Sequence, residues 1–205
     1  VYPCLPNRAE HYGAEGVAAF NMGGLLHVTL HNGVDINGRT TGLQTGDPRS
    51  FKTFEELYDA FFRQHKFFCY RIFWLGAVAR DICHEYTRTP LLSILGIDAS
   101  MDLGQDLTKA DPDHSMFGIS DRAIIDVADS FVAVKHLVYD DKVLTMDELM
   151  TALDSNFAGE RGEEIRQLCL HQPKYGNDNE EADAMVRRVS DESARIIYAY
   201  DNAPF

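Results

Sequence analysis

The sequence contains none of the short motifs that identify common nucleotide and hydrolase sites. It has no GxxxxGK[ST] or GxGxxG stretch, whose glycines let the backbone approach a phosphate, and no GxSxG elbow for a nucleophilic serine. Its longer apolar runs are interrupted by charges, and its first residues lack the basic and apolar regions of a signal peptide. These absences argue against nucleotide-binding, serine-hydrolase and membrane-spanning proteins, and we expect a cytoplasmic location.

Positive charge and paired cysteines are also scarce. Lys and Arg number 19 against 32 Asp and Glu, and the resulting net charge of −13 disfavours nucleic acid and anionic membranes as partners. No two cysteines form a CxxC pair, so reduced thiols are expected rather than disulfides. Two of them lie among apolar neighbours and are expected to behave as small buried hydrophobic residues. The four cysteines are Cys4, Cys69, Cys83 and Cys169, and the two that are expected to be buried are Cys69 and Cys169.

What the sequence has in abundance is helical periodicity. Thr53 and Glu56 have the spacing of a capping box, and apolar residues then recur in steps of three or four up to Tyr86, with a break only at His65. This predicts a helix of roughly nine turns. Its other face is also apolar, which predicts that much of it is buried, and Pro90 is expected to end it.

The rest of the chain is predicted from shorter signals. Proline, glycine and polar residues predict irregular structure for residues 1–22, 33–50 and 102–121. Periodicity leaves both a short buried strand and a helical turn open for residues 91–101. A short helix is expected at 23–32 with Gly33 as its C′ residue, and Thr145 with Glu148 predicts a second capping box. Further helices are expected at about 122–139, 145–157 (ended by Gly159), 162–171 and 180–199, the last with Ala182, Met185, Val189, Ile196 and Tyr200 on one stripe.

Two groups of polar residues contain the residue types of metal sites, but their spacing favours structural roles. His27 and His31 share a helix face, yet Val28 stands where a zinc protease needs glutamate, and no third ligand is in view. The acidic run at 178–183 lacks the ligand spacing of an EF-hand loop. We expect Asn177, Asp178 or Asn179 to cap the last helix, with Glu180 and Glu181 facing its positive end. No metal or cofactor is expected to bind in this segment.

The order of several longer stretches resembles one enzyme family. DVADSFVAVKHLVYDD, LTMDELMTALDSNFAG and IRQLCLHQPKYGNDNEEAD are similar to the pyruvate formate-lyase domain of glycyl radical enzymes. LLHVTLHNG, LQTGDPRSFKTFEELYDAFFRQ and TPLLSIL resemble upstream segments of that domain in the same order. The resemblance covers nearly the whole chain and implies an α/β, strongly helical fold: part of the family's α/β barrel, in which long helices surround a few parallel strands.

The resemblance also implies a radical mechanism. In this family an activating enzyme uses S-adenosylmethionine and an iron–sulfur cluster to make a glycyl radical, which oxidises a cysteine to a thiyl that abstracts hydrogen from a small organic substrate. By position, Cys4 matches that cysteine. The implied partners are the activating enzyme, the remainder of the parent chain and a second copy in a homodimer. Nothing matches the family's Arg-Val-x-Gly-Tyr radical segment, so we expect residues 1–205 to be a C-terminal portion of the domain without its radical glycine, inactive as an isolated fragment.

The subgroup depends on the residues around the cysteine. Dehydratases, the choline lyase and arylacetate decarboxylases commonly have Cys-x-Glu-Pro, with the glutamate in proton transfer, whereas this chain has Cys4-Leu5-Pro6-Asn7. A cysteine without that glutamate resembles the enzymes that add hydrocarbons to fumarate, such as benzylsuccinate synthase, or pyruvate formate-lyase itself. EGVAAFNMGGLLHVTLHNG and TGDPRSFKTFEELYDAF resemble the first group better, so radical addition to fumarate is the first expectation. A formate acetyltransferase, an arylacetate decarboxylase and a dehydratase stay open as alternatives, and a non-catalytic helical scaffold descended from the family is an alternative of another class.

Overall fold

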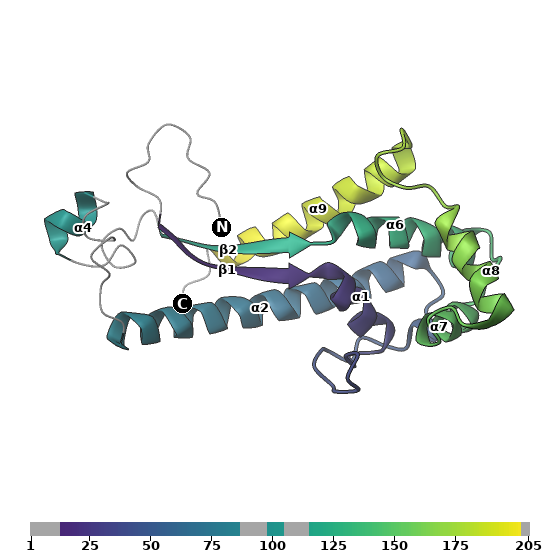
Figure 1. The fold of residues 1–205 in the computed structure, drawn as a ribbon, viewed down its shortest axis with the longest axis horizontal. Helices are drawn as coiled ribbons and strands as arrows, with labels where there is room; N and C mark the ends of the chain where they lie inside the picture. The colour runs from purple at the N-terminus through teal and green to yellow at the C-terminus, as the bar shows by residue number, and fades with distance from the viewer. Residues whose placement is uncertain (1–12, 87–97, 105–114, 202–205) are drawn as a thin grey trace. The chain divides into compact units, whose positions relative to one another are not determined.

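The computed structural model describes residues 13–86, 98–104 and 115–201 (Figure 1). The chain divides into two compact units, one of residues 1–20 and 70–120 and the other of residues 21–69 and 121–205. No helix in the described ranges is both long and apolar enough to cross a membrane. The elements are β1 (Gly13–Asn21), α1 (Met22–Leu30), the 3₁₀ turn η1 (Pro48–Ser50), α2 (Phe54–Tyr86), α4 (Asp98–Leu103), β2 (Ser115–Arg122), α6 (Ile124–Val134), the π-helix η2 (Lys135–Asp140), α7 (Met146–Asp154), α8 (Gly159–Leu170) and α9 (Glu180–Asp201).

The two strands correct two predictions of irregular structure. β1 and β2 pair in a two-stranded sheet and run in the same direction, each leading into a helix (Figure 1). The prediction of irregular structure is therefore wrong for residues 13–21 and 115–121. Glycines and serines in these stretches suggested breaks, but pairing between segments a hundred residues apart satisfies the backbone, which local sequence does not reveal. Helix α4 shows the helical alternative at residues 98–101 and continues to Leu103, so the prediction of irregular structure is also wrong for residues 102–103. Residues 91–97 lie outside the described ranges.

Helix α2 confirms the longest predicted element. It has 33 residues, and its capping box is present: the Glu56 N–H donates to Thr53 Oγ1 at 3.4 Å, and the Thr53 N–H donates to Glu56 Oε2 at 3.3 Å. These bonds satisfy backbone donors that have no partner inside the helix. The predicted end at Pro90 lies outside the described residues.

Helices α2 and α6 meet in an aromatic cluster in the unit of residues 21–69 and 121–205. Phe131 of α6 is fully buried, with its ring centroid 5.1 Å from Phe61, 5.6 Å from Phe54 and 5.7 Å from Tyr58. The Phe54 and Phe61 rings meet it edge to face, the arrangement that aromatic quadrupoles favour. Helix α6 also packs against α9 and α1. The predicted stripe of the last helix is confirmed as buried, as far as its side chains are described: Ala182, Met185, Val189 and Ile196.

The four predicted C-terminal helices are confirmed, with changed ends. The α6 helix continues as the π-helix η2 up to Asp140. Thr145 caps α7 through the predicted box with Glu148. The prediction that Gly159 ends this helix is wrong, because α7 ends at Asp154 and Gly159 is the first residue of α8.

The end of α1 shifts the predicted C′ position by one residue. Asn32 takes the left-handed C′ conformation with φ of 48°, and its N–H donates to Thr29 O at 3.2 Å. Gly33 follows as C″ with φ of 92°, and its N–H donates to Val28 O at 2.8 Å. The prediction of Gly33 as C′ is therefore wrong, because asparagine also tolerates this conformation.

Gly33 is expected to tolerate no side chain, in contrast to Gly38. Both have positive φ, but a Cβ at Gly33 would lie 2.6 Å from Leu43 O, whereas a Cβ at Gly38 would meet no atom within 4 Å. Gly33→Ala should therefore cost more than the roughly 1 kcal/mol expected for the conformational strain at Gly38→Ala. Denaturant unfolding of both variants measures the difference, and equal costs would contradict the close approach.

Candidate functional site

The sequence-predicted site residue Cys4 lies outside the described residues. What the structure describes is the framework that follows it: β1 begins at Gly13, and both strands end where a helix begins. In parallel sheets, ligands are usually bound beyond the carboxyl ends of the strands. Polar side chains stand at both ends. Asn21 accepts a hydrogen bond from the Gly24 N–H at 3.1 Å and so caps α1, and Asp121 occupies the end of β2.

Asp121 is the centre of a buried polar group that we call the Asp121 cluster: Asp121, His65, Cys69 and Ser193. The Asp121 side chain is 5% exposed, and its Oδ2 accepts a hydrogen bond from Ser193 Oγ of α9 and lies 3.5 Å from His65 Nε2 of α2. His65 Nε2 also lies 3.4 Å from Ser193 Oγ. The Cys69 thiol, one helical turn after His65, lies 3.7 Å from that same nitrogen. The cluster thus joins a strand end to two helices.

The cluster contains the residue types of a nucleophilic site but not the charge state that a thiol nucleophile needs. Burial, assisted by the negative charge of Asp121, raises the pKa of Cys69 to about 12. Attack by a cysteine requires the thiolate, which this pKa keeps negligible at neutral pH. The prediction that Cys69 behaves as a small buried residue is therefore confirmed. The same prediction is met only in part for Cys169, which packs against the core but is half-buried, and burial raises the pKa of its thiol as well.

Asp121 Oδ1 has no hydrogen-bond partner among the described residues although it is buried. A buried carboxylate oxygen without a partner is costly, so the bonds to Oδ2 are important for holding the strand end in place. Sequence reasoning missed Asp121 and Ser193, since each sits among residues that suggested loop or helix surface. The one signal for the cluster was His65, the only break in the apolar periodicity of α2.

His27 and His31 pack against each other rather than gathering further ligands. Their rings stack with centroids 4.0 Å apart, and His31 Nε2 lies 2.8 Å from Asp154 Oδ1 of α7. Burial and the neighbouring His31 lower the pKa of His27. Within residues 13–86, 98–104 and 115–201, no three His, Cys, Asp or Glu side chains are placed to hold a metal ion. The geometry matches the packing role expected from the sequence.

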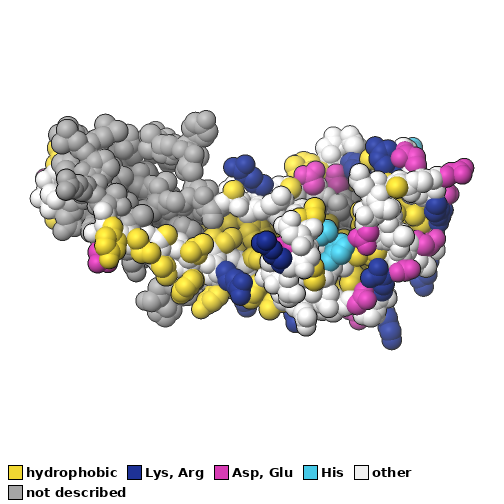
Figure 2. All heavy atoms as spheres, turned by 60° about the horizontal axis from the view of Figure 1, so that its bottom comes forward, with side chains coloured by type: hydrophobic (Ala, Val, Ile, Leu, Met, Phe, Trp, Pro, Cys, Tyr) yellow, Lys and Arg dark blue, Asp and Glu magenta, His cyan; other side chains and the backbone are white. Residues whose placement is uncertain are grey.

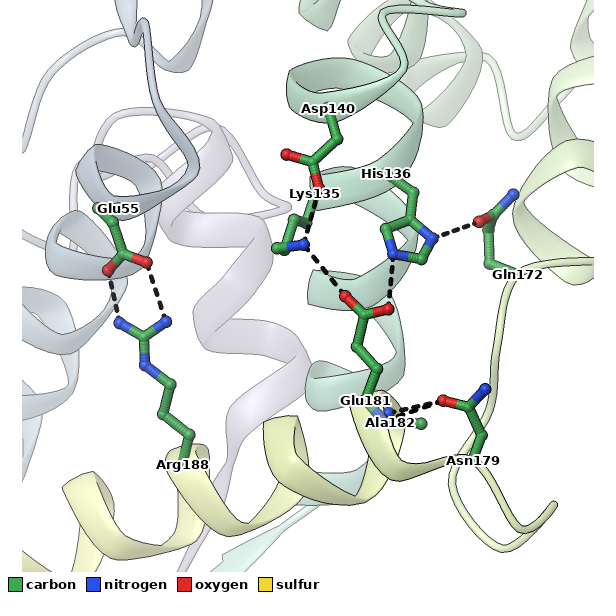
Figure 3. A network of polar contacts seen from close by, with 9 residues as sticks. All are labelled: Glu55, Lys135, His136, Asp140, Gln172, Asn179, Glu181, Ala182 and Arg188. Carbon is green, nitrogen blue, oxygen red and sulfur yellow. Dashed lines mark hydrogen bonds and ion pairs between the residues drawn. The ribbon is translucent and has the colours of Figure 1, made fainter.

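The first residues of α9 form a network of polar contacts with η2 (Figure 3). Lys135 Nζ donates to Asp140 Oδ2 at 2.7 Å and to Glu181 Oε1 at 3.0 Å, and His136 Nε2 lies 3.0 Å from Glu181 Oε2. Asn179 accepts hydrogen bonds from the N–H groups of Glu181 and Ala182, so the helix cap expected at 177–179 is Asn179. The hydrogen bond from Lys135 lowers the pKa of Glu181. These contacts fix the start of α9. The side chains of the network bond to one another, which indicates a structural role.

A groove of about 910 Å³ lies between α2 and α9. One of its walls carries Arg188, which is already occupied: both terminal guanidinium nitrogens donate to Glu55 (Figure 3). The guanidinium group also lies 3.8 Å above the Tyr58 ring. Both basic and acidic side chains line the rest of the groove, together with apolar ones. This mixture of charges selects no particular ligand.

The chain is similar to known radical enzymes over almost its full length. The family model "Pyruvate formate lyase-like" matches residues 5–204. Trans-4-hydroxy-L-proline dehydratase of Clostridioides difficile is 35% identical over 171 residues, which are 82% of this chain and 21% of the dehydratase. Isethionate sulfite-lyase of Oleidesulfovibrio alaskensis is 33% identical over 189 residues, 90% of this chain and 22% of the lyase.

A solved structure concerning 1,2-propanediol dehydration in Roseburia inulinivorans superposes with a TM-score of 0.83 at 28% identity, covering 91% of this chain and 24% of the other. The likeness confirms the expected fold class, a strongly helical α/β chain with parallel strands. The chain spans about a fifth to a quarter of the length of these relatives. Their activities do not support the expectation of fumarate addition and favour the dehydratase alternative.

Ser193→Ala is expected to destabilise the fold by about 1–3 kcal/mol, because it removes a donor from a carboxylate that already has one unpartnered oxygen. Ser190→Ala on the same helix is the matched control, since Ser190 is only partly buried. Denaturant unfolding of both variants measures the difference. If Ser193→Ala and Ser190→Ala cost the same, the Asp121 cluster does not hold the fold as inferred.

Cys69 is expected to make the fold less stable in alkali. Its pKa is raised from 9.0 to about 12 on folding, so the unfolded chain releases the thiol proton first. The contribution of this group to stability is complete below pH 9 and is lost as the pH rises towards 12, by roughly 1 kcal/mol per pH unit. Replacing the thiol in Cys69→Ala should therefore flatten the fall in unfolding free energy between pH 9 and 10. An unchanged slope would refute this assignment.

Proposed function

Because the chain belongs to the pyruvate formate lyase-like family of glycyl radical enzymes, we propose that it is the cysteine-bearing part of an enzyme that eliminates water or sulfite from a small organic substrate. The observation that carries the proposal is the pairing of a family match over residues 5–204 with relatives that are a dehydratase and a sulfite-lyase. In both named reactions a group leaves from carbon, and radical chemistry allows this without a strongly acidic C–H bond.

Cys4 is the residue proposed to carry the radical. Its S–H bond is comparable in strength to an activated C–H bond, so a thiyl at this position can take hydrogen from the substrate and return it to the product radical. The radical itself is proposed to come from a glycine outside residues 1–205, where an activating enzyme with S-adenosylmethionine and an iron–sulfur cluster installs it. This segment needs no cofactor of its own for that role.

The residues after Cys4 set a condition on the mechanism. Pro6 stands where many dehydratases of the family have the glutamate that transfers a proton. A proline has no acidic group, so the proton that accompanies the leaving group must move through a side chain from another part of the enzyme. The identity of that side chain is what distinguishes this enzyme from relatives with the Cys-x-Glu-Pro arrangement.

The described residues nearest to Cys4 form the frame that follows the cysteine segment in the sequence. Strand β1 begins nine residues after Cys4 and passes directly into α1, whose residue Leu25 is buried. A non-catalytic scaffold of the same descent would keep this frame and lose the radical.

Cys4→Ala in the full-length enzyme separates catalysis from scaffold. After anaerobic activation, the variant should keep the glycyl doublet in its electron paramagnetic resonance spectrum and lose turnover, because the radical forms but cannot reach the substrate. Trans-4-hydroxy-L-proline, isethionate and 1,2-propanediol are the substrates to try first. Cys169→Ala, a thiol of another helix, is the control and should keep both the signal and turnover. Unchanged turnover in Cys4→Ala would exclude the thiyl role, and a wild-type enzyme that forms no glycyl signal would favour the scaffold.

A further inference from the structure

The loop between α1 and α2 contains the dipeptide Asn-Gly twice, as Asn32-Gly33 and Asn37-Gly38. An asparagine followed by glycine is prone to lose its side-chain amide. Glycine has no side chain to shield its backbone nitrogen, so this nitrogen can reach the amide carbon of the preceding asparagine. Asparagine counts among the thermolabile residues of proteins. The two dipeptides are chemically identical, so only their surroundings can make them react differently.

The first pair is held by hydrogen bonds on both of its residues. Asn32 is partly buried, and its Oδ1 accepts a hydrogen bond from the Gly46 N–H at 2.9 Å. Gly33 is buried, its N–H donates to Val28 O at 2.8 Å, and its carbonyl oxygen accepts two backbone N–H groups from later in the loop. Attack at this pair would therefore break bonds that join the end of α1 to the loop.

The second pair lies at the exposed tip of the same loop. Asn37 and Gly38 are both exposed, and a Cβ built at Gly38 would meet no atom within 4 Å. The loop projects from the lower side of α1 in Figure 1, and Figure 2 views the surface from that side.

One residue, Asp35, holds this tip. Its Oδ1 accepts the Asn37 N–H at 2.9 Å, and its backbone oxygen accepts the Gly38 N–H at 2.9 Å. Exposed backbone hydrogen bonds of a loop open at a low free energy, whereas buried ones open rarely. The Gly38 nitrogen is therefore released for attack far more often than the Gly33 nitrogen.

We propose that Asn37 is a site of spontaneous deamidation, with Gly38 supplying the attacking nitrogen, and that Asn32 is protected from the same reaction. The Gly38 nitrogen loses its proton and bonds to Cγ of Asn37. The bond from Cγ to the side-chain nitrogen breaks, and ammonia leaves. Water then opens the cyclic imide at either carbonyl carbon, which leaves aspartate or isoaspartate at position 37. The reaction needs no radical and no Cys4, so it is independent of the proposed catalytic function.

Both products change the tip of the loop. Isoaspartate carries the backbone through the former side chain and lengthens it, whereas the bonds to Asp35 and the bridge between Val34 and Thr40 fit the unmodified spacing. Each product also places a negative charge near the Asp35 carboxylate, which is unfavourable for like charges. Deamidation at Asn37 thus alters the segment that connects α1 to α2.

Incubation of the full-length, unactivated protein at mildly alkaline pH tests the proposal. Peptide mass spectrometry after digestion at acidic pH, which stops the reaction, gives the deamidation rate at each asparagine. The rate of each residue in the folded protein is divided by its own rate in the urea-denatured protein. This ratio should be several-fold higher for Asn37 than for Asn32. Equal ratios, or a higher ratio for Asn32, would overturn the proposal.

The Gly38→Ala variant tests the attacking nitrogen. Its added methyl group has room in the structure but shields the nitrogen, so deamidation at Asn37 should slow several-fold while the rate at Asn32 stays the same. Gly176→Ala is the matched control, since Gly176 also has a positive φ and open space around it, and it should leave both rates unchanged. Chromatography of the wild-type peptides should resolve isoaspartate as well as aspartate. An unchanged rate in Gly38→Ala, or aspartate as the sole product, would show direct hydrolysis and contradict attack by Gly38.

Discussion

The contact of Phe131 with three aromatic rings of α2 is the interaction on which the unit of residues 21–69 and 121–205 depends. Phe131 is fully buried on α6, and Phe54, Tyr58 and Phe61 surround it from the first two turns of α2. Because α6 follows directly after β2, this contact also fixes where that strand ends. The aromatic cluster stabilises the fold by burying apolar surface, an effect that depends little on orientation. The polar contacts around the cluster depend on orientation, and they select one arrangement of the helices.

The polar contacts that select this arrangement of the helices are the Asp121 cluster and the network around Glu181. The Asp121 carboxylate links a strand end to α2 and α9, and the Glu181 carboxylate links the start of α9 to Lys135 and His136 (Figure 3). The two differ in environment. Asp121 is buried, so loss of a partner there is costly, whereas Glu181 is 43% exposed and its ion pairs contribute less each. Both serve to position elements, and the radical chemistry is proposed for a residue upstream of them.

Sequence patterns predicted the helical part of the fold well and the strands poorly. Thr53 with Glu56 and Thr145 with Glu148 located two helix starts, because a capping box involves only neighbouring residues. Residues 13–21 and 115–122 were predicted as irregular, because two strands separated by a hundred residues stabilise each other only after the chain has folded. The Asp121 cluster was missed for the same reason. His65, Asp121 and Ser193 are far apart in the sequence, and only the break at His65 marked the place.

The sequence by itself determined the family, the number and order of the long helices after residue 53, and the candidate cysteine, since each depends on local motifs or on the order of segments. Tertiary structure alone decided that Cys69 is held as a thiol, that Asn179 among three candidates caps α9, and that one Asn-Gly pair is exposed while the other is held by hydrogen bonds. These properties depend on which side chains surround a residue in space. Burial and partner geometry are set by contacts between distant segments, which helical periodicity and motif spacing do not specify.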